Sequence, residues 1–287
     1  MNLIIDIGNT TAKAALVSDG VIIKQERFSR AAIAGDGVIN REQFSRAAIA
    51  GDGVINQEQF SRAEQAGDTV INQERFSGAF PELIAGFAGN NPIDAAIISS
   101  VGTDPSDLIA WLGTVTKRVH HLTADSVYPF EIDYGTPETL GADRLAAAAG
   151  ALLHHPGADL LVIDAGSALT IDEVTGGAFR GGSISPGLSM RFRSLHEYTG
   201  RLPLVTKRSG FTFPGKTTMD AIAGGVMMGL AYEIIEYIRT FEKKYHNPVA
   251  VITGGDGGDI APLTGGKALL YPDLVTEGLN FLLEANV

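Results

Sequence analysis

The sequence predicts an α/β protein built from two related halves. Apolar runs of strand length alternate with segments of helix length along most of the 287 residues, and this alternation is typical of α/β folds. A strand that ends in Asp, Gly and hydroxyl residues also occurs twice, at Asp6–Lys13 and at Ile163–Thr170. The two copies indicate two half-molecules that face each other across a nucleotide.

The first copy has the residues of a phosphate-binding turn. Leu3–Ile5 form an apolar run suited to a buried strand, so the Asp6 carboxylate leaves the core where that strand ends. Gly8 lets backbone amides approach an anion closely, and the residues after it supply short donors and the charge of Lys13. This combination predicts a phosphate cradle with a carboxylate for Mg²⁺. The alternative is an ordinary β-hairpin turn in which Gly-Asn supplies positive φ.

The remaining elements follow in sequence order. The first half continues with a strand at Ala95–Val101, a helix at Pro105–Lys117 and an edge strand at Arg118–Thr123. The second half opens with an alanine-rich helix at Gly141–His155, so we place the domains at residues 1–140 and 141–287. Further strands are predicted at Leu160–Ala165, Leu169–Val174, Ala178–Ile184 and Val249–Thr253, and helices at Leu188–Leu202, Met219–Tyr245 and Leu274–Glu284.

A tandem repeat interrupts the first half. Gln25–Asn40, Arg41–Asn56 and Gln57–Asn72 are 16-residue copies. A helix at Arg41–Ala50 could be capped by Asn40, whereas the Asp-Gly pairs could turn hairpins. We favour short helices linked by Gly-Asp turns. Residues 29–76 are interpreted as an in-frame duplication tolerated in a surface loop, with a partner-binding module as the alternative.

Composition excludes several classes of protein. A hydrophobic content of 45% with 19% charged residues is typical of a globular protein with a substantial core. The net charge of −11 argues against a nucleic-acid partner, and the absence of cysteine excludes disulfides and thiolate chemistry. No basic segment followed by an apolar one opens the chain, and no apolar stretch reaches the roughly 20 residues of a membrane span. The sequence therefore predicts an unexported protein without a membrane partner.

An anionic substrate remains possible and would need a few well-placed cations. The candidates are Lys13, Arg144, Arg191 and Arg193.

Three further motifs could contact a ligand. Gly141–Arg144 opens a helix, where free amides and partial positive charge can dock an anion. Its carboxylate and guanidinium suit a reaction that removes a proton from an alcohol and holds a carboxylate, although Asp143 could simply stabilise the helix terminus. Gly181–Gly187 and Gly254–Gly257 could admit a ligand against the backbone or only turn the chain. Thr217 and Thr218 precede the long helix and could cap it.

Taken together, these motifs resemble those of type III pantothenate kinases, members of the acetate and sugar kinase, Hsp70 and actin superfamily. Asp6–Lys13 resembles the first phosphate motif of the family and Tyr134–Arg144 its substrate motif. Asp164–Thr170 resembles the second phosphate motif, and Gly181–Gly187 and Thr218–Ile222 follow in the family's order. The resemblance implies two actin-like (ribonuclease H-like) domains with a nucleotide cleft between them.

The resemblance also implies an activity. This is the ATP-dependent phosphorylation of pantothenate to 4′-phosphopantothenate, the first step of coenzyme A biosynthesis, with Asp143 as proton acceptor. Mg²⁺ would accompany ATP near Asp6, and Asp164 would bind a monovalent cation, K⁺ or NH₄⁺. The family further implies a cytoplasmic homodimer whose substrate site lies at the subunit interface. The implied substrate residues are Tyr134, Gly141, Ala142, Asp143, Arg144 and Thr218, and the implied ATP-binding residues are Asp6, Ile7, Gly8, Asn9, Thr10, Thr11, Ala12, Lys13 and Ser167.

Two departures and two alternatives accompany this hypothesis. Ser167 stands where the family usually has Thr, which keeps the hydroxyl, and the repeat has no family counterpart. Because an ordinary Asp has a pKa of about 3.9, we expect Asp143 to orient the substrate hydroxyl and to take its proton late. The same fold could phosphorylate another small alcohol such as a sugar, or serve as a regulatory protein that binds nucleotide without catalysis. The five charged motif residues argue against the regulatory alternative: Asp6, Lys13, Asp143, Arg144 and Asp164.

Overall fold

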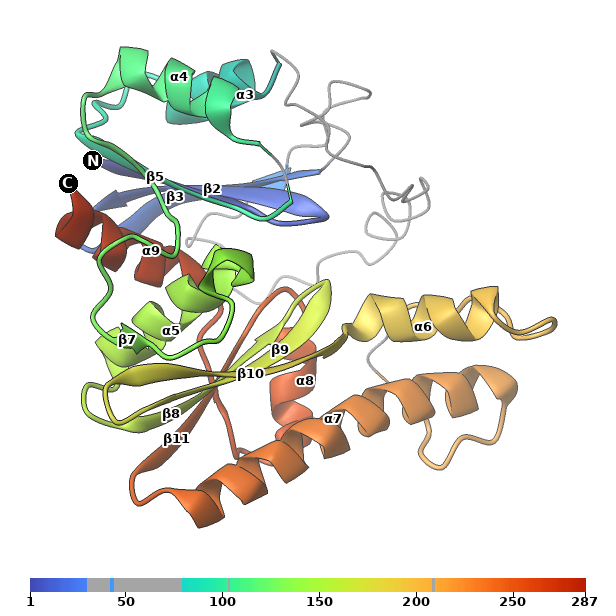
Figure 1. The fold of residues 1–287 in the computed structure, drawn as a ribbon. Coiled ribbons are helices and arrows are strands. Elements are labelled where there is room, and N and C mark those ends of the chain that lie inside the picture. Colours follow the sequence, from blue (N-terminus) through green and yellow to red (C-terminus); the bar gives the residue numbers. More distant parts are fainter. Residues whose placement is uncertain (30–41, 44–78, 103, 208–209) are drawn as a thin grey trace. The chain divides into compact units, whose positions relative to one another are not determined.

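The chain folds as two units, each built around one mixed β-sheet (Figure 1). The computed structural model describes residues 1–29, 42–43, 79–102, 104–207 and 210–287. The first unit is Met1–His121 and the second is Leu122–Val287.

The first sheet has β1 (Asn2–Ile7) at its centre. β1 pairs antiparallel with β2 (Thr11–Ser18) and parallel with β5 (Ala95–Ser100). β3 (Val21–Ser29) extends the antiparallel side and β6 (Val119–His121) extends the parallel side. The resulting order is β3-β2-β1-β5-β6, with the short β4 beyond β3.

Two helices cover one face of the first sheet (Figure 1). α3 (Ala79–Ala88) and α4 (Ser106–Val115) form a core cluster with the alternate apolar residues of β1, β2 and β5. Side chains alternate between the faces of a strand, so Asp6 points to the face opposite these helices. Asp6 is in register with Lys13 on β2 and with Ser99 on β5. These three polar residues therefore share one face at the end of the central strand.

The second sheet repeats the arrangement of the first. β8 (Asp159–Ala165) pairs antiparallel with β9 (Ala168–Thr175) and parallel with β11 (Pro248–Thr253). β10 (Ala178–Pro186) lies beyond β9, and β12 (Leu269–Leu270) lies beyond β11. The order β10-β9-β8-β11-β12 has the same sequence of antiparallel and parallel pairs as the first sheet. This repetition confirms the predicted α/β class and the two related, ribonuclease H-like halves.

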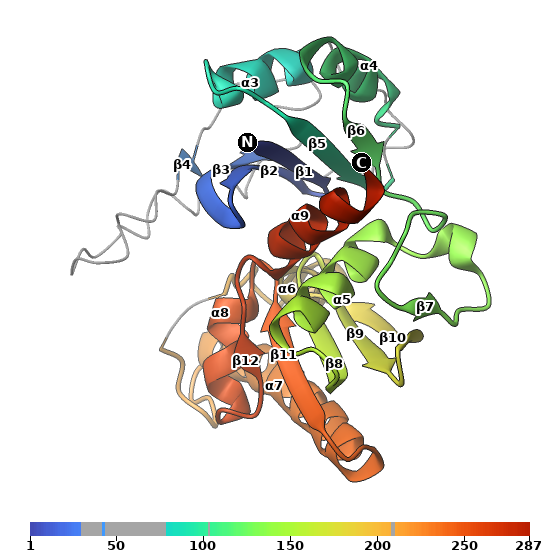
Figure 2. The ribbon, with the colours of Figure 1, turned by 90° about the vertical axis from the view of Figure 1, so that its left-hand side faces the viewer.

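Two helices lie on one side of the second sheet and pack closely together (Figure 2). α5 (Ala142–His154) lies against β8 and β9, and α9 (Leu274–Asn286) lies against α5. Gly150 and Gly278 allow this close approach, because a Cβ on either would stand within 3.0 Å of backbone atoms of the other helix. The contact fixes α5, whose first turn carries Asp143.

The opposite side of the second sheet is covered by α6 (Leu188–Glu197) and α7 (Thr218–Lys244) (Figure 1). By length and composition α7 could cross a membrane, with a mean hydropathy of 1.4 in its most apolar window, which the sequence analysis did not anticipate. Half of that window is buried inside the structure. The buried residues of α7 pack with alternate residues of β8 and β9 in one apolar cluster, as expected for a core helix.

Short elements complete the described chain. They are β4 (Glu42–Gln43), β7 (Glu131–Ile132), the 3-10 turns η2 (Pro137–Thr139) and η3 (Ala261–Thr264), and α8 (Gly257–Ile260). β7 pairs parallel with β10, which draws the segment before α5 into the second unit. The chain therefore passes from the first unit to the second between His121 and Leu122, whereas we placed the domain boundary between residues 140 and 141.

Two predicted helices differ from the structure. α6 ends at Glu197 rather than at Leu202 because Tyr198 leaves helical geometry, with φ of −100° and ψ of 12°. Most of the tandem repeat lies outside the described residues. Glu42–Gln43 is described, and it pairs antiparallel with Glu26 and Arg27, the matching positions of the first copy. The helix predicted at Arg41–Ala50 is wrong at these two residues, since they extend the open edge of β3 as a strand.

Candidate functional site

The first predicted phosphate motif forms a tight turn between β1 and β2. The Gly8 amide donates a hydrogen bond to the Thr11 carbonyl at 3.0 Å. Asn9, Thr10 and Thr11 are exposed, while Asp6 and Lys13 are half-buried at the two strand ends. The turn therefore presents hydroxyl and amide groups to solvent next to one carboxylate and one ammonium group.

Gly8 is not required by the conformation of this turn. Gly8 and Asn9 do not have positive φ, so the alternative in which Gly-Asn supplies that geometry is wrong in this detail. A Cβ on Gly8 would make only an ordinary contact, 3.4 Å from the Thr11 carbonyl. The absence of a side chain leaves space on the open side of the turn, where a ligand could approach the backbone.

The second motif forms a related turn in the second unit, one residue shorter than the first. Asp164 is half-buried near the end of β8, and the Gly166 amide donates to the Ala168 carbonyl at 3.0 Å. Ser167 is exposed at the tip of the turn. Asp164 pairs with Thr170 on β9, in the way that Asp6 pairs with Lys13 on β2. The repeated signal in the sequence therefore corresponds to a repeated structure.

Two glycines from distant motifs pack around the second turn. A Cβ on Gly187, the residue before α6, would lie within 3.0 Å of the Gly166 and Ser167 carbonyls. A Cβ on Gly254, after β11, would lie within 3.0 Å of the Asp164 carboxylate. The structure thus brings together the second phosphate turn and the two glycine-rich motifs that were ambiguous in sequence. The N-terminus of α6, with its partial positive charge, begins next to the turn.

Asp143 lies in the first turn of α5, after the N-cap residue Gly141. Its Oδ1 accepts a hydrogen bond from the Arg144 amide at 2.9 Å. A Cβ on Gly141 would stand within 3.0 Å of Asp143 Oδ1, so a larger residue there would displace the carboxylate. Burial raises the pKa of the Asp143 carboxyl above its ordinary value, and hydrogen bonding and charge from Arg144 offset this in part. A raised pKa makes the carboxylate a stronger base.

Arg144 is occupied by an ion pair inside the protein. Its Nε donates to Asp172 Oδ2 at 3.0 Å and its Nη2 donates to Asp172 Oδ1. Both side chains are buried, with exposed fractions of 6% for Arg144 and 2% for Asp172. The guanidinium therefore does not extend from the helix to hold a substrate carboxylate, as the sequence had indicated it could.

Asp172 is the residue of this site that the sequence analysis missed. It lies on β9 on the same face as Thr170, two residues away along the strand. A carboxylate between Ile171 and Glu173 in a strand that is otherwise half apolar was the available signal. Because the position of its partner on α5 depends on the fold, the pair itself could not be inferred.

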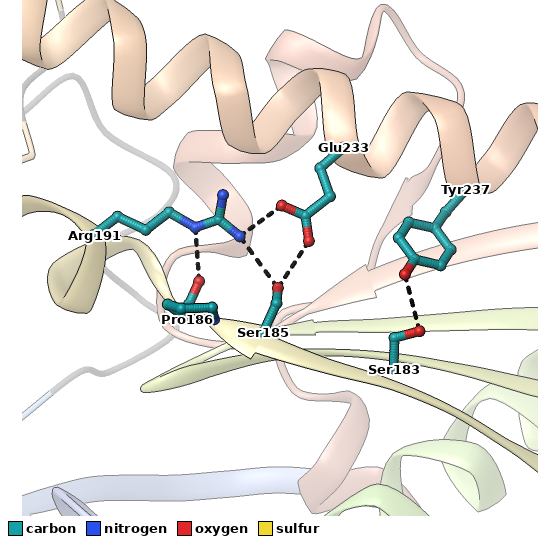
Figure 3. A network of polar contacts seen from close by, with 6 residues as sticks. All are labelled: Ser183, Ser185, Pro186, Arg191, Glu233 and Tyr237. Carbon is teal, nitrogen blue, oxygen red and sulfur yellow. Dashed lines mark hydrogen bonds and ion pairs between the residues drawn. The ribbon is translucent and has the colours of Figure 1, made fainter.

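Two other candidate cations are also paired within the chain, and Figure 3 shows the contacts of one of them, Arg191. Arg191 of α6 donates to Glu233 of α7 at 2.6 Å, to Ser185 at 3.1 Å and to the Pro186 carbonyl at 2.7 Å. Arg193 pairs with Glu197 at 3.0 Å. The Arg191 network ties α6 and the end of β10 to α7, and so supports the helix that begins at the second turn.

Tyr134 and Thr218 occupy different parts of the second unit. The Tyr134 ring packs edge-on against Phe179 and lies 5.7 Å from the Arg144 guanidinium carbon. Thr218 is exposed at the start of α7, where the neighbouring Thr217 supplies the cap by accepting from the Asp220 amide. The first turn of α7 lies well away from the start of α5 within this unit (Figure 1). One copy of the unit therefore does not bring Thr218 to Asp143.

A cavity of about 370 Å³ opens on the α7 side of the second sheet. Its lining includes Glu173, Arg180, Ser183, Tyr237 and Lys244. Asp143, Asp164 and Asp172 do not line it. Among the described residues, no group of three or more His, Cys, Asp or Glu side chains is placed to hold a metal ion.

Comparisons with known proteins agree with this arrangement of motifs. The sequence model of the type III pantothenate kinase family matches residues 47–240. A type III pantothenate kinase of Porphyromonas gingivalis is 42% identical over 199 residues, which cover 68% of this chain and 81% of the relative. One of Phocaeicola vulgatus is 32% identical over 289 residues, covering 100% of this chain and 99% of the relative.

A solved structure shares the fold. It is a Campylobacter jejuni protein assigned to a Baf family of transcriptional activators, 20% identical, with a TM-score of 0.52. The similarity covers 98% of this chain and 97% of that chain. From the sequence matches and the two turns, the chain belongs to the type III pantothenate kinase family.

Proposed function

We propose that this protein transfers the γ-phosphoryl group of ATP to pantothenate and forms 4′-phosphopantothenate, the first step of coenzyme A biosynthesis. One observation carries the proposal. In a member of this family, a carboxyl group whose pKa is raised by burial lies at the N-terminus of α5. A sugar kinase or an inactive regulatory protein has no comparable support, since the relatives above are named pantothenate kinases.

Asp143 is proposed to act on the substrate hydroxyl. The carboxylate would accept the hydroxyl proton while the oxygen attacks the γ-phosphorus in line, with ADP as the leaving group. The raised pKa of Asp143 brings the base closer to the working pH and makes proton transfer easier in the transition state. The hydrogen bond from the Arg144 amide keeps Oδ1 oriented, which favours orientation of the hydroxyl before its proton moves.

The two turns are proposed to hold the ATP phosphates. The Gly8 and Gly166 amides are used within the turns, so the exposed residues at the turn tips, Asn9 and Thr10 in the first and Ser167 in the second, would meet the phosphates. Lys13 would add a positive charge. Mg²⁺ would arrive with ATP. Asp6 fits this role, because Mg²⁺ in such sites is held by one or two carboxylates together with substrate phosphates.

A monovalent cation, K⁺ or NH₄⁺, is proposed to bind at Asp164. The carboxylate is half-buried and has glycines on two sides, Gly166 and Gly254. These glycines leave room for an ion and for the carbonyl oxygens that would complete its shell. A cation there would reduce the repulsion between the phosphates held by the adjacent turn.

Pantothenate is proposed to lie near Tyr134, Gly141 to Arg144 and Thr218, in a cytoplasmic homodimer. Since Thr218 lies far from Asp143 within one unit, we propose that the second copy supplies it. Arg144 would border the substrate and act on it through Asp143, because its side chain is paired with Asp172 and its amide donates to the Asp143 carboxylate.

The proposal is tested by an ADP-release assay. The enzyme should turn over pantothenate in K⁺ or NH₄⁺ buffer with Mg²⁺-ATP, and should not turn over glucose, N-acetylglucosamine or N-acetylmannosamine. Asp143→Asn should lower kcat by about 10²-fold or more. Turnover of a sugar but not of pantothenate would reject the proposed substrate, and near-native turnover by Asp143→Asn would reject the proposed base.

A further inference from the structure

We propose that Asp172 is a positioning residue for phosphoryl transfer, which acts through Arg144 to fix the first turn of α5 and the charge around Asp143. The inference rests on the proposed role of Asp143 as the base. It assigns a function to a carboxylate that lies on another element and does not belong to the sequence motifs.

The geometry of the pair is that of a clamp between a helix and a strand. Two nitrogens of the Arg144 guanidinium bind the two oxygens of Asp172, so both partners have a fixed orientation. Arg144 directly follows Asp143 in α5. These two hydrogen bonds resist rotation or shift of the first turn of α5. The Asp143 carboxyl is therefore held in place relative to β9.

The surrounding residues are shaped around this clamp. A Cβ on Gly182 would stand within 3.0 Å of both Asp172 Oδ1 and the Ile171 carbonyl. Gly181 has a φ of 84°, and its position lies against the Tyr134 ring. A β-bulge in β10 between Phe179 and Gly182 provides this space. The Gly-Gly motif thus makes room for the clamp in this structure.

Aromatic rings enclose the guanidinium. The Arg144 carbon Cζ lies 5.7 Å from the Tyr134 ring and 5.6 Å from the Phe179 ring. Such contacts favour a cation and exclude water from it. Buried ion pairs are costly to form, and the sequence keeps this one next to a carboxyl that the reaction uses. We attribute the position of the Arg144–Asp172 ion pair to its effect on the charge around Asp143.

The clamp also controls the charge that Asp143 senses. Burial raises the pKa of Asp143, and the hydrogen bond and positive charge of Arg144 lower it. The negative charge of Asp172 partly cancels the positive charge of Arg144. Reciprocally, the charge of Asp143 contributes to the raised pKa of Asp172, for which burial is the main cause. The other charged or titratable groups on the elements packed around the clamp include Asp159 and Asp164 on β8, Glu173 on β9, Arg180 on β10 with its partner Asp133, Tyr134, Glu284 on α9, and the His154–Glu277 pair between α5 and α9.

The test compares pH profiles of kcat in matched variants. Asp172→Asn leaves the Arg144 charge uncompensated, so the acidic limb should move to lower pH by about one unit and kcat should fall by about tenfold or more. The KM for ATP should stay within about twofold, since the phosphate turns are unaltered.

The double variant Asp172→Asn with Arg144→Gln removes both charges and should return the acidic limb of the kcat profile toward its original pH. Glu236→Gln, in the exposed pair with Arg239, is the control and should change neither the limb nor kcat.

A purely structural role predicts a different result. It would lower thermal stability and leave the acidic limb in place in both variants, and that outcome would overturn the inference. A second measurement does not depend on whether Asp172→Asn folds. In carboxyl ¹³C NMR, the titration of Asp172 should move to lower pH in Asp143→Asn, because the coupling between the two carboxyls is reciprocal. An Asp172 titration that is the same in both proteins would also overturn it.

The inference and the proposed function can fail separately. If Asp143→Asn keeps full turnover, Asp143 is not the base and the role of Asp172 falls with it. If Asp143→Asn is inactive while Asp172→Asn folds with an unmoved limb, only the inference about Asp172 fails.

Discussion

Gly254 lies directly against the carboxylate of Asp164. A Cβ on Gly254 would stand within 3.0 Å of Asp164 Oδ1 and of the Ala165 carbonyl, and the residue has a φ of 91°. The end of β11 is therefore shaped to leave space beside the carboxylate at the end of β8. This relationship gives the glycine-rich segment after β11 a specific part in the proposed cation site.

The first prediction concerns this contact. Gly254→Ala should displace the Asp164 carboxylate and strain the backbone, which costs on the order of 1–3 kcal/mol of folding free energy. The concentration of K⁺ that gives half-maximal activity should rise by about tenfold or more, or about 1.4 kcal/mol. Both effects are measured by thermal unfolding and by ADP release in a K⁺ titration.

Gly258→Ala is the matched control for this variant. Its Cβ would meet no atom within 4 Å, and its φ is not positive, so stability and the K⁺ titration should stay unchanged. A Gly254→Ala enzyme that responds to K⁺ as the unaltered enzyme does would contradict the proposed site at Asp164.

Much of the fold could be predicted because it follows from local patterns. The strands at β8, β9 and β11 were expected within one or two residues of their observed limits, since apolar runs and Gly turns define them. The two turns at Gly8 and Gly166 were expected as a related pair. The two sheets around these turns also have the same order of antiparallel and parallel strand pairs. The alternation of strands and helices along the sequence does not by itself specify that order.

The candidate site was predicted less completely, because part of it depends on contacts between distant segments. The proximity of Gly187 to the turn at Gly166, and of Asp172 to Arg144, requires the path of β10 and the position of α5. Arg144 and Arg191 were candidates for binding an anionic substrate because sequence shows a charge but not its partner. The structure supplies Asp172 and Glu233 as those partners.

The second prediction uses the raised pKa of Asp143. When a carboxyl has a higher pKa in the folded state, the folded protein binds more protons between the two pKa values, so stability falls as pH rises through that window. Asp143→Asn removes this cost and should raise the melting temperature at pH 7. The gain should amount to about 1.4 kcal/mol for each pH unit that separates the two pKa values. Thermal unfolding at several pH values measures it.

This gain should disappear as the pH falls below the unfolded pKa of about 3.9, where Asp143 is protonated in both states. Asp125→Asn, an exchange at an exposed carboxyl outside the site, controls for general effects of charge. If Asp143→Asn is less stable than the unaltered protein at pH 7, burial does not destabilise the Asp143 carboxylate.

The third prediction contrasts two helical glycines. Gly150→Ala should destabilise the protein by about 1–3 kcal/mol, because its Cβ would stand within 3.0 Å of the Leu274 carbonyl of α9. Gly113→Ala in α4 should instead stabilise it by roughly 0.5–1 kcal/mol, since its Cβ would meet no atom within 4 Å. Chemical denaturation of both variants gives the two free energies. If both variants lose stability, the space available for a Cβ does not explain the difference expected between Gly150 and Gly113.

The last prediction is that residues 29–76, three units of 16 residues, are dispensable for catalysis. Their copies are too alike to have been shaped individually for different places in a core, and the candidate site residues lie outside them. Excision joins Phe28 to Ser77 and removes β4, which pairs with β3 at the edge of the first sheet. Because the cost of loop closure grows only logarithmically with length, the insertion costs the fold only on the order of 1–2 kcal/mol. The shortened protein should have a kcat/KM for pantothenate within about twofold of the full chain and an equal or higher melting temperature. If it is insoluble or inactive, the repeat instead contributes to the core or to a subunit interface.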